Sequence, residues 1–259
     1  MTDSDVLIEA PADGVMQITL NRPHRMNALG FDMTLRLSEV LQQLVTAKAK
    51  VLMIRGAGRG FCAGADLKER REMNAERRSA HNAAINDFVD ALARAPMPTI
   101  AVVNGAALGG GCEIALACDL RVIADDAQIG LTETRIGVIP GAGGTQRLPR
   151  LIGAARAMEM MMTGEPVPGS RAAAIGLANT AVPSPELDAC ALALARTLAA
   201  RSPLGLRAIK SLVYQGLEMT AEEGLRLERE RLKELLCSAD YAEGLAAFAE
   251  HRAPRFTGN

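Results

Sequence analysis

Aromatic side chains are scarce in this sequence. They supply 3% of its 259 residues, and tryptophan is absent. Ala, Leu, Ile, Val and Met must therefore build the core of a chain that is long enough for one large α/β domain, or for a core with a smaller helical appendage. Hydrophobic residues make up 49% of the chain and charged residues 23%. These values are ordinary for a folded globular protein and exclude a disordered or collagen-like chain.

A surplus of charge is also absent. The 29 basic and 30 acidic residues give a net charge of −1. This balance provides no bulk attraction for nucleic acid or an anionic membrane, so any polyanionic ligand must be bound locally. The cysteines form an odd set without a C-x-x-C pair, which indicates reduced thiols and predicts a cytoplasmic location. They are Cys62, Cys112, Cys118, Cys190 and Cys237.

Neither a targeting segment nor a membrane-spanning segment is predicted. The first nine residues are acidic and lack an apolar run, unlike a secretory signal or a basic transit peptide. The most apolar window, residues 99–118, contains Asn104, Glu113 and four glycines. This composition favours a strand, a loop and a buried helix over a membrane span. We therefore predict no association with a membrane.

Hydrophobic periodicity predicts alternating strands and helices in the first half of the chain. The predicted strands cover residues 15–20, 51–55, 99–103 and 120–123, and the predicted helices cover about 31–45, 66–73 and 110–118. Glycine-rich loops follow the second and third of these strands. The repeated order of strand, glycine loop and helix predicts an α/β core that binds ligands at helix N-termini.

Beyond residue 150 the periodicity is mainly helical. The predicted helices there cover residues 154–162, 171–175, 187–200, 204–215, 221–237 and 241–251. We therefore predict an α/β core over residues 1–200 and a helical C-terminal region over residues 201–259.

Two predicted helix starts are suited to binding an anion or a carbonyl oxygen. Small residues at 63–65 precede the helix that begins near Asp66, and three glycines at 109–111 precede an apolar helix. Backbone N–H groups are free at such positions, and two of them could share one oxygen. The candidate donors are Ala65 and Gly110, because paired donors stabilise an enolate oxygen. Taken alone, the first motif is explained more simply by a tight turn with Asp66 as the helix cap.

Glu113 and Glu133 are the candidate carboxylates for proton transfer. Glu113 lies in the first turn of an apolar helix, a position that the helix dipole explains by itself. Burial among core residues would, however, raise its pKa toward the range that is useful for acid/base chemistry. Glu133 lies in a short segment before a glycine-rich loop, where an ion pair with Arg135 is the alternative explanation.

Other chemistries lack their residues. The sequence has no G-x-S-x-G elbow, and its three histidines show no metal-ligand spacing, so neither a serine hydrolase nor a metal site is predicted. Residues 58–63 match the degenerate dinucleotide pattern G-x-G-x-x-A, but a strand and a helix precede them, whereas that turn usually opens its domain. A nucleic-acid-binding protein is disfavoured because the richest basic stretch, residues 68–78, is interleaved with acids.

Four motifs, taken together, resemble the enoyl-CoA hydratase/isomerase (crotonase) superfamily from about Ile18 to the C-terminus. They are Asn21-Arg-Pro with Asn27-Ala-Leu29, Phe61-Cys-Ala-Gly-Ala-Asp66, Asn104-Gly105 with Gly109-Gly-Gly-Cys-Glu113, and Ile139-Pro-Gly-Ala-Gly-Gly-Thr-Gln-Arg-Leu-Pro149. The resemblance implies a crotonase-like spiral of ββα units, followed by helices that build a trimer, often stacked into a hexamer. It also implies that Ala65 and Gly110 supply the oxyanion donors.

The resemblance implies hydration of a 2-enoyl-CoA to a 3-hydroxyacyl-CoA by syn-type addition, because hydratases of the family carry glutamates at both positions. Glu113 would activate the water and Glu133 would deliver the α-proton. Such a reaction needs no metal and no redox cofactor, since coenzyme A is part of the substrate. An isomerase that uses one glutamate is an alternative. Residues 61–73 and 243–256 look closest to methylglutaconyl-CoA hydratases, which are a second alternative.

The resemblance also implies where coenzyme A binds. The residues expected to contact it are Arg25, Met26, Asn27, Ala28, Ala63, Asp66, Leu67 and Lys68. Lys68 would lie near the nucleotide phosphates, although a solvated helix lysine explains it equally well. Phe256 is expected to reach the site of a neighbouring subunit. Residues between positions 70 and 88 are expected to line the acyl pocket and to set substrate choice.

Overall fold

The computed structural model describes residues 4–259. Its main sheet is built from six strands: β1 (Val6–Ala12), β2 (Val15–Leu20), β3 (Val51–Gly56), β5 (Thr99–Val103), β7 (Leu120–Ala124) and β10 (Thr180–Val182). They lie in the order β1-β2-β3-β5-β7-β10. All neighbours are parallel except the antiparallel pair β1 and β2. Strand β5 is buried along its whole length, which explains its continuous apolar sequence.

A second sheet is made of four short strands. They are β4 (Gly60–Cys62), β6 (Ala106–Leu108), β8 (Gln128–Gly130) and β9 (Val167–Pro168), in the order β4-β6-β8-β9. Strands β4, β6 and β8 each follow directly on a strand of the main sheet. Helices α2 (Leu67–Glu72) and α4 (Gly110–Ala117) come next after β4 and β6. These repeats confirm the predicted α/β fold of ββα units.

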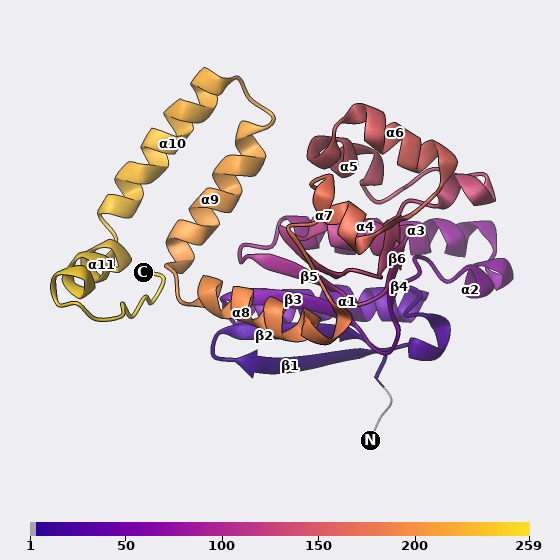
Figure 1. Ribbon diagram of the computed structural model, residues 1–259, viewed down its shortest axis with the longest axis horizontal. Coiled ribbons are helices and arrows are strands. Elements are labelled where there is room, and N and C mark those ends of the chain that lie inside the picture. The colour runs from indigo at the N-terminus through magenta and orange to yellow at the C-terminus, as the bar shows by residue number, and fades with distance from the viewer. Residues whose placement is uncertain (1–3) are drawn as a thin grey trace.

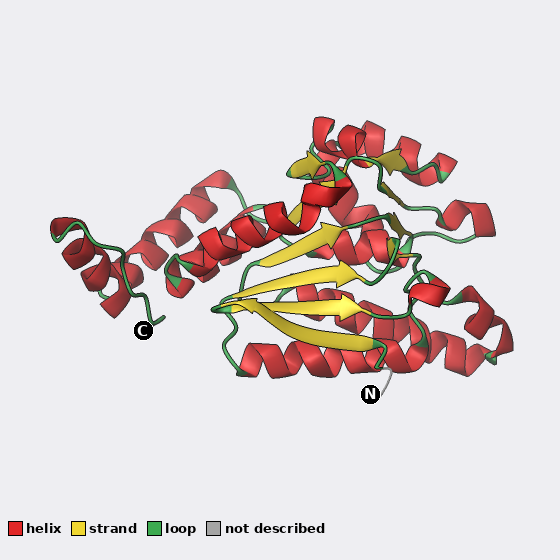
Figure 2. Ribbon diagram, turned by 60° about the horizontal axis from the view of Figure 1, so that its bottom comes forward, coloured by secondary structure: helices red, strands yellow, loops and turns green. Residues whose placement is uncertain are grey.

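Helices flank the main sheet (Figure 2). Helix α8 (Leu187–Ala199) packs across β3, β5 and β7, and α1 (Phe31–Thr46) packs against α3 (Ala75–Ala93). The core between them is aliphatic, as the composition predicts, and its largest fully buried side chains are Phe61 and Phe88. The remaining helices of this part are α5 (Gly144–Ile152), α6 (Ala154–Thr163) and α7 (Gly169–Ala174), with short 3-10 turns η1 (Pro23–Arg25), η2 (Glu133–Ile136) and η3 (Ser184–Glu186).

The last three helices extend away from the two sheets (Figure 1). They are α9 (Pro203–Gly216), α10 (Ala221–Leu236) and α11 (Ala239–Ala249), and we call them the helical arm. An ion pair of 2.9 Å between Lys210 Nζ and Asp119 Oδ2 joins α9 to the core, and the Tyr214 hydroxyl donates to the same carboxylate at 3.1 Å. Within residues 4–259, no helix is long and apolar enough to cross a membrane.

Several elements were not predicted from the sequence. Strand β10 falls in the part that was predicted to be mainly helical, and its three residues are too few for a period-2 pattern. Strand β1 is exposed at five of its seven residues, so its side chains do not alternate as in a half-buried strand. Helix α3 carries many small and polar residues, and α5 contains Pro149 and lacks a side-chain cap at its start.

Candidate active site

A cavity of about 390 Å³ lies where α4 begins. Its walls come from the segment before α2, from α2 and α3, from the start of α4, and from residues 132–142. Both candidate donors, Ala65 and Gly110, and both candidate carboxylates, Glu113 and Glu133, line this cavity. Residues that are far apart in the sequence are therefore brought together as the motifs predict.

The amides of Ala65 and Gly110 lie next to each other and are free. A Cβ placed on Gly110 would lie 3.7 Å from the Ala65 nitrogen, and one placed on Gly64 would lie 3.0 Å from the Gly110 nitrogen. Neither amide donates to an acceptor within the described part of the chain. Their neighbours are fixed, because Leu29 N donates to Gly64 O, and Asp66 N donates to Leu29 O. Two preorganised donors of this kind can bind one oxygen.

Close backbone contact explains the glycine run at the start of α4. A Cβ on Gly111 would lie 2.1 Å from the Cys62 carbonyl oxygen, so no larger residue fits there. Gly109 has φ 53° and ψ −122°, a conformation that L side chains rarely adopt. A Cβ on Gly109 would also lie 3.1 Å from Glu133 Oε1. The glycines thus let the helix start lie against β4 and against the second carboxylate.

Glu113 is almost fully buried and held by main-chain donors. Its side chain is 3% exposed, and Oε1 accepts from Ala142 N at 2.6 Å and from Gly144 N at 2.9 Å. Burial raises the pKa of this carboxyl, while the two amides and the charge of Arg147 oppose the increase. A helix dipole does not account for this arrangement, because donors from a distant loop have been brought to the carboxylate.

Glu133 lies at the start of η2 and is half-buried. Its Oε2 is buried and has no hydrogen-bond partner among residues 4–259. Burial, and then the charge of Glu113, raise its pKa to about 7. The alternative ion pair with Arg135 does not form, since Arg135 pairs with Glu165 at 2.6 Å. An oxygen without a partner at this depth is suited to bind a water molecule or a substrate atom.

The two carboxyl groups have unequal environments, which suits a division of acid and base roles. Glu113 has two N–H donors that stabilise its ionised form, whereas burial and the charge of Glu113 raise the pKa of Glu133 to about 7. Together with the two free amides, the cavity can polarise a carbonyl group, remove one proton and deliver another. Because the carboxyl groups interact, their titration belongs to the pair.

Asn27 and Asp66, two of the residues expected to bind coenzyme A, form hydrogen bonds within the protein. The Asn27 side chain is fully buried and donates to Gly60 O at 2.8 Å while accepting from Arg22 N at 2.9 Å. Asp66 caps α2 by accepting from Lys68 N and Glu69 N, and it pairs with Arg22. These contacts fix the loop before α2. A role of either residue in binding coenzyme A stays a prediction.

The other residues of that set are distributed around the loop. Ala63 and Leu67 line the cavity, and Lys68 is exposed on α2 but does not line it. Arg25 is exposed, Met26 is half-buried with φ 53°, and Ala28 is buried. Phe256 approaches Gly244 of α11. Their contacts with coenzyme A also stay predictions.

The sequence did not single out several residues of the cavity wall. Ile136, Val138 and Ile139 are exposed and form an apolar wall, and of these three only Ile139 belongs to one of the four motifs, as its first residue. Arg70 and Asn82 also line the cavity; Arg70 lies in the stretch of residues 61–73 that looks closest to methylglutaconyl-CoA hydratases, and no motif marks Asn82. They do lie in the segment between positions 70 and 88 that was expected to reach the acyl pocket.

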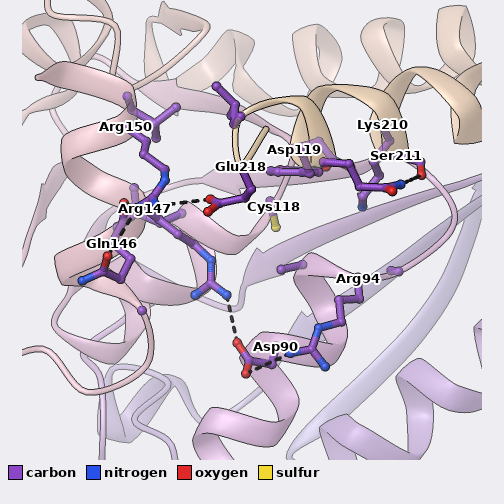
Figure 3. A pocket seen from close by; sticks show the side chains of 18 of the residues that line it. Asp90, Arg94, Cys118, Asp119, Gln146, Arg147, Arg150, Lys210, Ser211 and Glu218 are labelled. Atoms are coloured by element: carbon purple, nitrogen blue, oxygen red, sulfur yellow. Dashed lines mark hydrogen bonds and ion pairs between the residues drawn. The ribbon is translucent and has the colours of Figure 1, made fainter. Parts of the chain in front are cut away.

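A larger cavity, of about 770 Å³, lies between the core and the helical arm (Figure 3). Ion pairs of 2.9 Å between Arg147 and Asp90 and of 3.2 Å between Arg150 and Glu218 lie along its wall. Neither candidate glutamate lines it. Since it lacks both the free amides and the carboxyl pair, the smaller cavity is the candidate active site.

The spiral of ββα units and the cavity at its helix starts define an enzyme of the crotonase superfamily. The sequence matches the Enoyl-CoA hydratase/isomerase family over residues 11–259. It is 42% identical over 257 residues to the mitochondrial enoyl-CoA hydratase domain-containing protein 2 of Mus musculus, covering 97% of this chain and 87% of the relative. It is 39% identical over 257 residues to the mitochondrial methylglutaconyl-CoA hydratase of the same organism, covering 97% and 82%.

Solved structures agree with the sequence comparison. The enoyl-CoA hydratase from Bacillus anthracis superposes with a TM-score of 0.96 at 38% identity, covering 99% of this chain and all of that one. The chain therefore belongs to the enoyl-CoA hydratase/isomerase family.

Proposed function

We propose that this protein adds water to a 2-enoyl-CoA thioester and forms a 3-hydroxyacyl-CoA. The observation that carries the proposal is one cavity in which two free amides, of Ala65 and Gly110, meet two carboxyl groups, of Glu113 and Glu133. Relatives that are named enoyl-CoA hydratase and methylglutaconyl-CoA hydratase support it. Short-chain enoyl-CoA is the first choice of substrate.

In the proposed reaction the thioester oxygen accepts hydrogen bonds from both amides, which makes the β-carbon electrophilic. Glu113 removes a proton from a water molecule whose oxygen bonds to the β-carbon. Negative charge moves through the enolate, and the α-carbon takes a proton from Glu133. Both parts of the water add from the side of the carboxyl pair, which gives syn-type addition. No step calls for a metal or a redox cofactor, and coenzyme A is part of the substrate.

The proposal is tested by hydration of crotonyl-CoA, followed as the loss of enoyl absorbance. We expect Glu113→Gln and Glu133→Gln each to lower the rate by at least ~10²-fold, the usual scale for loss of a general acid or base. Glu159→Gln, on the exposed side of α6, is the matched control and should leave the rate unchanged. Full hydratase activity in Glu113→Gln would contradict the paired-carboxylate mechanism.

The same assay separates hydration from double-bond migration. An isomerase of this family would convert a 3-enoyl-CoA to a 2-enoyl-CoA with one glutamate, so it would not need the second carboxyl group. The partnerless Oε2 of Glu133 favours hydration, because a water molecule needs an acceptor on that side. Rapid isomerisation without hydration, retained in Glu133→Gln, would favour the isomerase.

We further propose that the helical arm assembles the chain into a trimer, or into a hexamer of two trimers. Large apolar side chains are exposed on all three of its helices, among them Val213, Leu232 and Phe248, and Leu217 is exposed just after α9. Buried contact with other copies would remove this surface from water. The cytoplasmic location and the lack of nucleic-acid binding stay predictions.

A further inference from the structure

His81 is a fully buried histidine behind the wall of the candidate active site. It lies on α3 and packs edge-on against Phe31, with 5.8 Å between the ring centres. Its Nδ1 accepts a hydrogen bond from Arg70 Nε at 3.3 Å. Arg70 lines the cavity, and its Nη2 donates to the Asn82 side-chain oxygen. One ring nitrogen of His81 is therefore attached to the cavity wall.

The contact with Arg70 decides which tautomer of His81 is present. Burial, and then the charge of Arg70, lower the pKa of the ring, so His81 is neutral at neutral pH. A neutral imidazole has one N–H donor and one acceptor, and a guanidinium can only donate. Nδ1 is therefore the acceptor, and the proton lies on Nε2.

The N–H donor of His81 lies beside the main chain of Leu29. Leu29 is the main-chain hydrogen-bond partner that acts on the pKa of His81, in the direction that raises it. Nε2 is nevertheless buried without an acceptor at hydrogen-bond distance and angle among residues 4–259, so this contact is long. The Leu29 carbonyl accepts from Asp66 N at 2.9 Å and has a second lone pair for another donor. A buried donor without a close partner requires an explanation.

Leu29 in turn holds the oxyanion donor Ala65 from both sides. Its N–H donates to Gly64 O at 2.8 Å, and its carbonyl accepts from Asp66 N, so the two hydrogen bonds enclose Ala65. Leu29 and Ala65 form a β-bridge. The Leu29 side chain also lies 3.6 Å from the place that a Cβ on Gly110 would take. A displacement of Leu29 would therefore move the Ala65 amide, whose placement decides how well it binds an oxygen.

We propose that His81 positions the oxyanion donor Ala65 through the Leu29 carbonyl. Arg70 supports this role by selecting the tautomer that carries the proton on Nε2. When a thioester oxygen binds to the Ala65 amide, the Nε2–H group closes its hydrogen bond to Leu29 O and holds the loop in place. Hydrogen bonds at active sites are often long before a ligand binds. This inference rests on the proposed function, because it concerns the same site.

The first test uses two substitutions that each keep one half of the histidine. The amide nitrogen of glutamine can replace Nε2–H, whereas the amide oxygen of asparagine can replace Nδ1. One oxyanion donor contributes ~10²–10³ in rate, and we expect His81→Asn to lose part of this, about tenfold in kcat for crotonyl-CoA with little change in KM. His81→Gln should keep most of kcat. Unchanged kcat in His81→Asn, equal losses in both variants, or a loss confined to KM would each overturn the proposal.

The second test follows the polarised carbonyl group and needs no turnover. Butanoyl-CoA is saturated and cannot be hydrated, and the infrared stretch of its isotope-labelled thioester carbonyl falls in frequency as hydrogen bonds to the oxygen strengthen. We expect a fall on binding to the wild type, a smaller fall in His81→Asn and a full fall in His81→Gln. Only bound ligand is shifted, so partial unfolding of a variant does not alter the frequency. The same frequency in the wild type and in His81→Asn would reduce His81 to a packing role and overturn the proposal.

Variants on α2 test the part of Arg70. Arg70→Met removes the donor to Nδ1 and frees the tautomer, so kcat and the carbonyl stretch should change as in His81→Asn, by a smaller amount. Arg70→Lys retains a donor and should restore most of both. Arg71→Met alters an exposed neighbour that does not line the cavity, and it should change neither. A wild-type stretch in Arg70→Met would contradict the role of Arg70. If no enoyl-CoA is hydrated at all, the proposed function fails, and the stretch of bound butanoyl-CoA still decides the role of His81.

Discussion

The two glutamates differ in a way that the sequence does not reveal. Motifs placed both of them at one site, but their protonation depends on neighbours that come from elsewhere in the chain. Glu113 receives two amide donors from the segment that begins α5, whereas Glu133 Oε2 receives none among the described residues. The roles proposed for them follow from this difference rather than from residue type.

Burial of Glu133 makes a prediction about stability. Its pKa is raised from 4.5 to about 7, so between these pH values the folded chain keeps a proton that the unfolded chain releases. The free energy of unfolding therefore declines as pH rises through that window. Above pH 7 the folded chain bears the full cost of keeping the buried Glu133 carboxyl group ionised. Glu133→Gln removes the cost, and its melting temperature should exceed that of the wild type at pH 8.

The comparison is made by thermal unfolding at two pH values. At pH 4.5 the difference between Glu133→Gln and the wild type should be small, because the carboxyl group is protonated in the folded chain. Glu159→Gln serves as the control and should behave alike at both values. An equal change in melting temperature at pH 4.5 and pH 8 would show that the charge of Glu133 is not the cause.

Other single residues have structural contacts that the motifs do not reveal. The side chains of Asn27 and Asp66 hold the loop before α2 in place, and their predicted contact with coenzyme A stays a prediction. A motif records that a residue type is needed at a position, and it does not say whether the need is structural or chemical. Asn82 shows the reverse case, since it belongs to no motif and gains its interest only from its position in the cavity.

At the scale of elements, long periodic segments were predicted well and short ones were not. Strands β2, β3, β5 and β7 and helices α1, α4, α8 and α10 match the predicted ranges to within one or two residues. Helix α3 was missed because its exposed face carries alanines beside charged residues, which blurs the pattern. The short strands of the second sheet were missed because two or three residues hold no period.

Helix α5 controls the environment of Glu113 through Arg147. The Nη1 of Arg147 donates to Ala142 O at 2.7 Å, and its Nη2 donates to Asp90 at 2.9 Å. Ala142 N in turn donates to Glu113. We expect Arg147→Met to loosen these donors and to remove a nearby positive charge. The pKa of Glu113 should then rise, which moves the acidic limb of the pH profile of kcat/KM to higher pH.

The profile is measured with crotonyl-CoA from pH 5 to pH 9. A displacement of about one pH unit would lower kcat/KM about tenfold on the acidic limb. Arg150→Met, one turn further along α5, is the matched control, since Arg150 pairs with Glu218 and touches neither Ala142 nor Asp90. A lower kcat with an unmoved acidic limb would mean that Arg147 acts through packing alone.

At the scale of the whole molecule, the helical arm was predicted as helices, but its direction was not. An ion pair and a tyrosine hydroxyl at Asp119 fix where α9 leaves the core, and no local pattern encodes such a contact between distant residues. Exposed apolar side chains along the arm, by contrast, follow directly from its sequence. Phe248 is 82% exposed in the single chain.

We expect the combined substitution Leu217→Glu and Phe248→Glu to dissociate the assembly without unfolding the chain. Both side chains are mostly exposed in the single chain, so their loss removes little contact within it. Light scattering during size-exclusion chromatography should show a mass that falls toward the 27.4 kDa of one chain. Arg229→Glu, an exposed change on α10, is the control and should keep the wild-type mass. An unchanged mass for the double variant would show that these residues are not in an interface.

The donors at Ala65 and Gly110 are main-chain groups, and this has an evolutionary consequence. Apart from proline, which lacks the N–H, no exchange of a side chain deletes an amide. A descendant that loses both glutamates would therefore still carry two adjacent amides that can bind one oxygen. New reactions can arise when substitutions change the carboxyl groups and the cavity walls, because the two main-chain donors stay in place.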